Sequence, residues 1–156
     1  MTNDTTNAEF NSGFNTTLDR VTCVHTDSAS TLDEALNAAE YDIVTLRGES
    51  IGDTASLFGQ IGRDLPGDTD PPTHNWDALA DWIWQFMAAR GSNRIALVWR
   101  DAHVLLNSSL PALFKTVQIV SDVSREAEAG EGGFPFPVRI VLCLVGDGDG
   151  FPPFTG

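Results

Sequence analysis

Four short apolar segments alternate with longer amphipathic ones, and this order is what most constrains the fold of the chain. We predict strands at residues 20–26, 42–47, 94–100 and 138–145. We predict helices at residues 31–40, 53–64, 75–90 and 111–129, with a short one at 102–106. Strands separated by helices usually form a parallel sheet with right-handed crossovers. The sequence therefore predicts an α/β fold, in which helices cover a small parallel β-sheet of three to four strands.

The helix predictions rest on capping residues and on apolar spacing. Thr31 opens the first helix with a capping signal, because acidic residues follow it within one turn. The last long helix should face the core with Leu113, Phe114, Val117, Ile119 and Val120. Among the tryptophans, we expect Trp82 and Trp99 in the core. Trp76 and Trp84 are candidates for exposed anchors, because protein interfaces favour Trp.

The two ends of the chain differ in character from its middle. Residues 1–17 are rich in Thr, Asn and Ser and are predicted to form a flexible arm. Residues 147–156 show no periodicity and are predicted to form a disordered tail. Residues 18–146 then form one domain, which suits a chain of 156 residues. The Gly-Asp repeat at 146–150 lacks the spaced ligands of a calcium loop, so we expect neither a metal site nor a cofactor.

The segment 75–84 is predicted to present two carboxylates on one stripe of a helix. Asn75 suits the N-cap position, because its side chain can accept from the free amides of the first turn. Asp77 lies in that first turn, where the helix dipole favours a negative charge. Asp81 follows four residues later on the same stripe, and Trp84 continues it. The opposite face should pack into the core through Leu79, Trp82, Ile83 and Phe86.

The chain as a whole is strongly acidic. It has 22 acidic against 9 basic residues, for a formal net charge of −13. Binding nucleic acid normally requires a basic surface, so we expect no direct contact with DNA or RNA. An acidic surface suits a basic protein partner, although acidity can also serve solubility alone. Five Asp and no Lys or Arg lie between residues 64 and 81, so negative charge is concentrated around the helix at 75–90.

Several strings together resemble one family. Asn-Trp-Asp-Ala-Leu-x-Asp at 75–81, shortly after Leu65-Pro66, resembles the signature of the barstar family, which inhibits small secreted ribonucleases. Asp-Ile-Val-Thr-Leu-Arg-Gly at 42–48 resembles that family's first strand and the glycine turn after it. Ile-Ala-Leu-Val-Trp-Arg at 95–100 is similar to its second strand, and Arg-Glu-Ala at 125–127 to the end of its last helix. The resemblance covers residues 41–146, and the strand-helix extension at 18–40 is similar to the front end of longer members.

This resemblance implies a barstar-like fold and a binding function rather than an enzymatic one. The chain would be an immunity or antitoxin protein that blocks the cationic active-site cleft of a cytotoxic ribonuclease. Asp77 and Asp81 match the family's two contact aspartates, and Asn75 would hold the start of their helix. Glu126 matches an acidic residue on the neighbouring helix that also reaches the enzyme. The expected assembly is a monomer that forms a 1:1 heterodimer with the nuclease.

The chain departs from the family pattern in the loop before the motif. Residues 67–74 contain no aromatic side chain, and Thr73 replaces a usual Gly. Ala80 occupies a position where an aromatic residue can occur, and His74 is expected to lie in the loop near the interface. We retain Trp84, Ala80 and His74 as candidate partner-binding residues. The altered loop favours a partner other than the standard guanyl-specific enzyme.

Two other classes of function remain open. The domain could be an interaction module that binds a basic partner without inhibiting a nuclease, or the acid pair could be catalytic, which would require a substrate cleft. No apolar run is long enough to span a bilayer, and the first twenty residues lack the pattern of a signal peptide. We therefore expect a cytoplasmic protein without membrane contact, in which Cys23 and Cys143 stay reduced.

Overall fold

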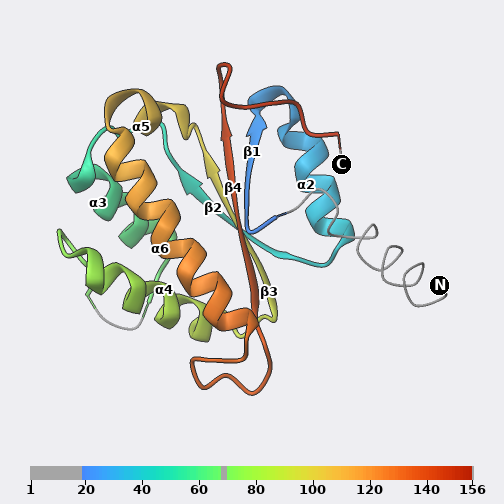
Figure 1. The fold of residues 1–156 in the computed structure, drawn as a ribbon, viewed down its shortest axis with the longest axis vertical. Coiled ribbons are helices and arrows are strands. Elements are labelled where there is room, and N and C mark those ends of the chain that lie inside the picture. Colours follow the sequence, from blue (N-terminus) through green and yellow to red (C-terminus); the bar gives the residue numbers. More distant parts are fainter. Residues whose placement is uncertain (1–18, 68–69, 156) are drawn as a thin grey trace.

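The computed structural model describes residues 19–67 and 70–155. Its centre is a four-stranded sheet in the order β1-β4-β3-β2, in which every neighbouring pair is parallel (Figure 1). The strands are β1 (Val21–His25), β2 (Asp42–Arg47), β3 (Arg94–Arg100) and β4 (Arg139–Gly146). The predicted α/β fold with a small parallel sheet is confirmed, and the predicted extension supplies the edge strand β1.

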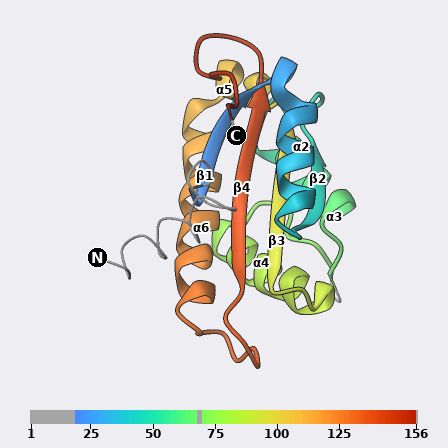
Figure 2. The ribbon, with the colours of Figure 1, turned by 90° about the vertical axis from the view of Figure 1, so that its right-hand side faces the viewer.

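Helices cover the two faces of the sheet unequally. A short 3-10 turn, η1 (Thr26–Ser28), leads into α2 (Ala29–Ala38), which packs alone against one face. The other face is covered by α3 (Thr54–Asp64), α4 (Trp76–Arg90), α5 (His103–Ser108) and α6 (Leu110–Glu128). Figure 1 shows the sheet between α2 and the larger helical layer, and Figure 2 views the sheet from the side of α2.

The sheet separates two hydrophobic clusters because successive strand residues point to opposite faces. In β3, Leu97 and Trp99 pack with the helices α3 to α6, whereas Ala96 and Val98 pack with α2. All five residues from 95 to 99 are buried, as expected for a central parallel strand covered on both sides.

Two helix predictions differ from the structure in detail. The first helix begins at Ala29 rather than Thr31, and Asp33 forms an ion pair with Arg100 of β3 at 2.9 Å instead of serving the helix start. Phe114, predicted to face the core, is 63% exposed. Its neighbour Leu113 is buried, and side chains one position apart on a helix diverge by about 100°. The core stripe of α6 runs through Leu113 and Val120, which leaves Phe114 in solvent.

The C-terminal segment is ordered, contrary to the predicted disordered tail. Phe151 is buried in the cluster with α3 to α6, and Phe154 is buried in the cluster with α2. The backbone amide of His25 donates to the carbonyl of Pro152 at 2.9 Å, and the amide of Phe154 donates to the Ser28 hydroxyl at 3.0 Å. Two isolated aromatic residues give no periodic signal, yet each fills a site beside the sheet. The predicted flexible arm at 1–17 lies outside the described residues.

The two cysteines lie on opposite sides of the sheet. Cys143 packs with the α2 cluster, and Cys23 packs against the other cluster. Both are free thiols, and burial raises the pKa of Cys143 to about 12. In the described part of the chain, no helix combines the length and the apolar character needed to cross a bilayer.

Candidate functional site on helix α4

Helix α4 begins and ends with the caps that its sequence predicts. The Asn75 side chain accepts from the backbone amide of Asp77 at 2.9 Å, so the free end of the first turn is satisfied. Gly91 ends the helix in the left-handed conformation, and its amide donates to the carbonyl of Met87. The predicted core residues Leu79, Trp82, Ile83 and Phe86 are all buried.

Neighbouring elements hold α4 in its middle and at its end. In its middle, the Trp82 indole Nε1 donates to the carbonyl of Leu65, just after α3, at 2.8 Å. Gly67 permits this contact, because a Cβ at that position would lie 2.9 Å from the Trp82 ring. At its end, Arg90 pairs with Asp42 at the start of β2. These contacts fix both the position and the rotation of the helix.

Trp76 contributes to this support and is not an exposed anchor. Its ring lies 5.0 Å from that of Phe58 on α3, at an interplanar angle of 58°. It is partly buried and packs against the main core cluster. The position after the N-cap therefore joins α4 to α3 instead of projecting towards a partner.

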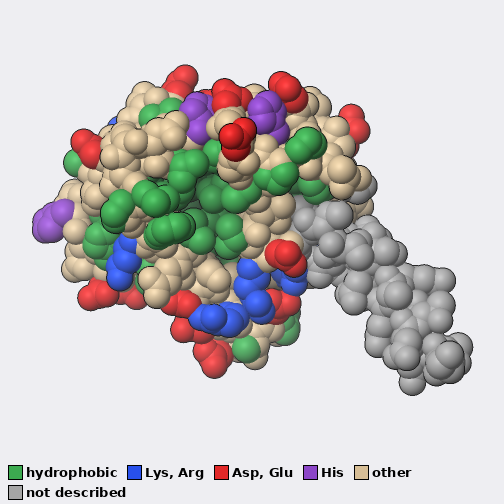
Figure 3. Space-filling model, turned by 45° about the horizontal axis from the view of Figure 1, so that its top comes forward, with side chains coloured by type: hydrophobic (Ala, Val, Ile, Leu, Met, Phe, Trp, Pro, Cys, Tyr) green, Lys and Arg blue, Asp and Glu red, His purple; other side chains and the backbone are tan. Residues whose placement is uncertain are grey.

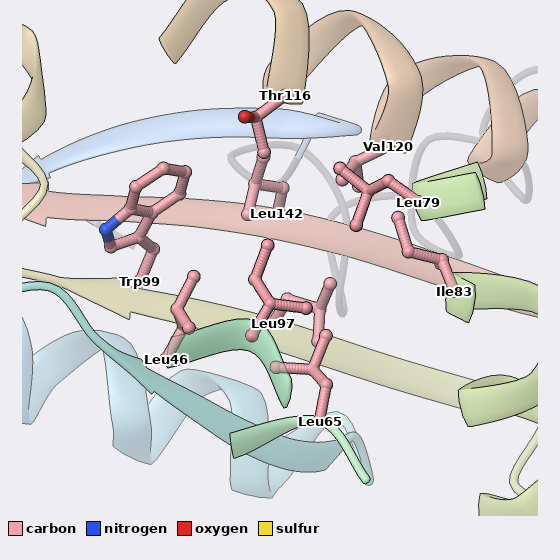
Figure 4. Close-up of a pocket in the computed structure, with 10 residues that line it drawn as sticks. Leu46, Leu65, Leu79, Ile83, Leu97, Trp99, Thr116, Val120 and Leu142 are labelled. Atoms are coloured by element: carbon pink, nitrogen blue, oxygen red, sulfur yellow. The ribbon is translucent and has the colours of Figure 1, made fainter. Parts of the chain in front are cut away.

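A small apolar cavity lies beneath α4. Its volume is about 20 Å³, and Leu79 and Ile83 of α4, Thr116 and Val120 of α6, and Leu97 of β3 are among its walls (Figure 4). The Thr116 hydroxyl already donates to the carbonyl of Ala112 at 2.8 Å. A buried water needs about two to four polar partners, which this apolar lining does not offer.

The two predicted contact aspartates lie on the outer surface of α4. Asp77 and Asp81 are exposed, one turn apart. Within residues 19–67 and 70–155, neither carboxylate forms an ion pair, whereas Asp33, Asp42 and Asp64 are each paired with an arginine. The stripe thus presents negative charge that the described part of the chain leaves available to an external cation.

The loop between α6 and β4 approaches the same face of α4. The ring of Trp84 lies 5.6 Å from that of Phe134, with an interplanar angle of 33°. A hollow opens beside the two rings, and its lining residues are Asp81, Trp84, Gln85, Ala88, Gly132 and Phe134. The structure therefore brings Asp81 and Trp84 together at one surface feature, together with a loop that sequence reasoning did not include in the site.

Glu126 lies on the neighbouring helix but lines a different hollow. It is exposed near the end of α6, beside Arg20, Arg125, Glu128, Ala129 and Glu131. Arg20 is paired with Glu128, and Arg125 with Asp122. The surface around Glu126 therefore mixes both signs of charge, in contrast to the stripe on α4.

The remaining candidates differ in their access to a partner. His74 is exposed before the N-cap, and its Nδ1 is 2.9 Å from the Thr73 hydroxyl oxygen. Ala80 is partly buried and packs against the core, so it adds little to the outer surface. Residues 68 and 69 of the altered loop lie outside the described residues.

The model of the family described as barstar (barnase inhibitor) matches residues 41–141, which is more than half of the chain. The chain belongs to the barstar family. The match extends from the start of β2 into β4 and includes α4 with Asn75, Asp77 and Asp81, as well as Glu126 on α6. The search of curated proteins found no match.

Strand β1 and helix α2 precede residues 41–141 and therefore lie outside the segment that the family model matches. These elements extend the sheet by one strand at the edge next to β4 and cover its second face. Helix α2 lies across the sheet from the helical layer that carries the acidic stripe. The candidate site therefore belongs wholly to the segment that the family model matches.

The residues that sequence reasoning missed are Gly132 and Phe134. The segment 130–137, Gly-Glu-Gly-Gly-Phe-Pro-Phe-Pro, indicates a turn, but nothing in its spacing predicts which helix it contacts. Gly132 has a φ of +87°, and Phe134 is partly buried against Trp84. The sequence shows only an aromatic residue flanked by turn residues shortly after a long helix. This pattern is too general to predict that Phe134 contacts Trp84.

Proposed function

We propose that this barstar-family protein inhibits a cytotoxic ribonuclease by placing Asp77 and Asp81 in the nuclease's active-site cleft. The observation that carries this proposal is the pair of exposed carboxylates on a helix that is capped and is held in its middle and at its end, with no ion pair to either within the described residues. Membership of a family described as barnase inhibitors supports the same function.

The chemistry of the two partners is complementary. A ribonuclease must bind phosphate, so its cleft is lined with cationic side chains. Carboxylates can replace substrate phosphates there through charge-assisted hydrogen bonds, and arginine does so with two parallel bonds. Because α4 is already fixed by Trp82 and Arg90, little conformational entropy is lost when the acids bind.

Four further residues complete the proposed interface. Asn75 holds the start of α4, Trp84 extends the contact surface beyond Asp81, and His74 and Glu126 lie at its margins. The protein would act as a cytoplasmic immunity protein, in a 1:1 complex with a basic nuclease. Because the loop at 67–74 lacks aromatic side chains, we propose a nuclease other than the standard guanyl-specific type.

The test is titration of candidate basic ribonucleases with the purified protein. We expect activity to fall to zero at a one-to-one ratio. Asp81→Ala should weaken binding by at least about 2 kcal/mol through faster dissociation, and Asp77→Ala by less. Glu49→Ala is the matched control, because Glu49 is an exposed acid outside α4.

Two outcomes would contradict the proposal. If Asp81→Ala dissociates no faster than Glu49→Ala, α4 is not the inhibitory surface. If a basic nuclease binds at the acidic stripe yet keeps full activity, the protein is an interaction module rather than an inhibitor.

A further inference from the structure

The hollow beside Asp81 combines an acidic side chain with an aromatic wall. Helix α4 contributes Asp81, Trp84, Gln85 and Ala88, and the loop between α6 and β4 contributes Gly132 and Phe134. The two ring systems are in contact, and Asp81 stands one turn before Trp84 on the exposed side of the helix. Two segments more than forty residues apart in sequence thus build one surface feature.

The loop can adopt this position only because residue 132 is glycine. A Cβ there would lie 2.5 Å from the six-membered ring of Trp84, closer than side-chain carbons approach each other. The backbone also has a φ of +87°, which other residues rarely adopt. Glycine meets both constraints, so the loop can pack closely against the indole of Trp84.

The charge of the hollow identifies its occupant. None of the residues that line it is basic, and within the described ranges Asp81 has no ion-pair partner. A cationic side chain therefore suits this hollow, and its aromatic wall favours a group that also packs against a ring. Guanidinium meets both demands, because it pairs with a carboxylate through two hydrogen bonds and stacks on aromatic faces. An ammonium is a compact, strongly hydrated charge without a flat face.

We propose that the hollow formed by Asp81, Trp84, Gly132 and Phe134 is a subsite for one arginine side chain of the partner. The guanidinium pairs with the Asp81 carboxylate and lies against the Trp84 and Phe134 rings. This subsite rests on the proposed inhibitory function for its biological partner, but its chemistry can be tested without the nuclease. It also supplies aromatic contacts that the loop at 67–74 lacks.

The test is an NMR titration of the full, isotopically labelled chain with acetyl-arginine-amide. The readout is the set of backbone amide and tryptophan indole signals. Trp84→Phe assigns the Trp84 indole signal. We expect a saturable shift of this signal with acetyl-arginine-amide. At equal ionic strength, acetyl-lysine-amide should bind at least about threefold more weakly. Asp81→Asn, an exposed and nearly isosteric change, should weaken the arginine probe by about fivefold or more.

Matched controls separate this subsite from general attraction to an acidic protein. Glu49→Gln removes an exposed acid outside α4 and outside the proposed interface, and it should leave arginine binding unchanged. Phe134→Ala should weaken it, whereas Phe114→Ala, which removes a more exposed Phe from α6, should not. Equal affinity for the two probes, or an effect of Glu49→Gln as large as that of Asp81→Asn, would overturn the proposal.

Measurements with an inhibited nuclease distinguish the two proposals from each other. If the nuclease is inhibited and neither Phe134→Ala nor the arginine probe shows an effect, the subsite is wrong and the inhibitory function stands. If the arginine probe binds as expected and no basic nuclease is inhibited, the inhibitory function is wrong and the subsite stands. In the complex, Phe134→Ala should raise the dissociation rate by about tenfold, and Phe114→Ala should leave it unchanged.

Discussion

Asp81 and Leu79 are two positions apart on α4 and have opposite roles. Asp81 is exposed and without an ion pair in the described residues, whereas Leu79 is 0% exposed and contacts the cavity between α4, α6 and the sheet. If α4 carries the proposed site, binding and stability should therefore depend on different side chains of the same helix. Substitutions on its two faces should separate the two properties cleanly.

The loss of the Asp81 carboxylate should leave the stability of the fold nearly unchanged. We expect Asp81→Ala to change the free energy of unfolding by no more than about 0.5 kcal/mol, the usual range for surface substitutions. Denaturant unfolding of the free protein measures this difference. A loss greater than about 1 kcal/mol would show that the acid supports the fold, and would undercut its assignment to the interface.

Leu79→Ala should destabilise the protein strongly. Removing a fully buried Leu side chain costs about 2–5 kcal/mol, and the cost rises with the cavity that remains. Here the new space would join an existing cavity of about 20 Å³, so we expect a value in the upper half of that range. Unfolding by urea gives the comparison, with Asp81→Ala as the control on the same helix. A loss below about 1 kcal/mol would mean that α4 collapses onto the cavity.

At the scale of elements, α4 depends on contacts with α3 and β2. Trp82 donates to the chain just after α3, and Arg90 joins the end of α4 to the start of β2. Asp42 also accepts from the Ser92 hydroxyl at 2.8 Å, so one carboxylate is hydrogen-bonded both to the end of α4 and to the turn into β3. The helix that carries the proposed site is thereby tied to the sheet edge.

The Asp42 pair should make stability depend on pH in the acid range. Hydrogen bonds from Arg90 hold the pKa of Asp42 below its ordinary value of 3.8. A lowered pKa in the folded state means that this stabilisation is present above 3.8 and is lost as the pH falls through the folded value. Near neutral pH, we expect the free energy of unfolding of the wild type to exceed that of Asp42→Asn. This difference should disappear as the pH falls below the folded-state pKa of Asp42. A difference that widened on acidification would contradict this assignment.

Sequence periodicity located the elements well because their core residues recur regularly. Residues 42–47 and 94–100 coincide with β2 and β3, and the caps at Asn75 and Gly91 bound α4 as predicted. Phe114 was wrongly assigned to the core, because the sequence does not distinguish one apolar residue beside the core stripe of a helix from the apolar residues within that stripe. The hollow at Trp84 could not be predicted, because it depends on where a glycine-rich turn meets a helix more than forty residues earlier.

At the scale of the whole molecule, one face combines apolar surface with many acidic side chains, and Lys and Arg side chains gather in its lower part as drawn (Figure 3). Figure 3 shows hydrophobic side chains gathered in the middle of one face, with acidic side chains along its edges. Leu110, Phe114 and Phe136 are the large hydrophobic residues with substantial exposure among those described. With a net charge of −13, the protein should attract a basic partner from a distance, before any of these side chains makes contact.

Association with a basic nuclease should therefore be fast at low salt and slow as salt is added. Charge steering is screened beyond a Debye length of about 10 Å at about 0.1 M ionic strength. Stopped-flow mixing over a range of salt concentrations measures the effect. Glu49→Ala should lower the association rate only slightly and leave dissociation unchanged. An association rate that does not vary with salt would rule out steering by the net charge.

The C-terminal segment should matter for stability. Phe151 is 4% exposed and Phe154 is 9% exposed, and the segment pairs with the end of β1 and the start of α2. We expect Phe151→Ala to cost about 3–5 kcal/mol, as for other buried Phe residues. Removal of residues 147–156 should cost at least as much, as measured by thermal unfolding. An unchanged melting temperature would mean that these aromatic contacts contribute nothing.

The pairing of the first strand with the last has a consequence for biosynthesis. In the described sheet, β1 pairs only with β4, so its partner leaves the ribosome more than a hundred residues later. Helix α4, which carries the proposed site, is made well before that. The sheet beneath it is complete only once β4 has been translated and has inserted between β1 and β3. We therefore expect nascent chains and early-terminated products that lack β4 to have no finished scaffold for the acids, so that the proposed inhibition would begin only after β4 has left the ribosome.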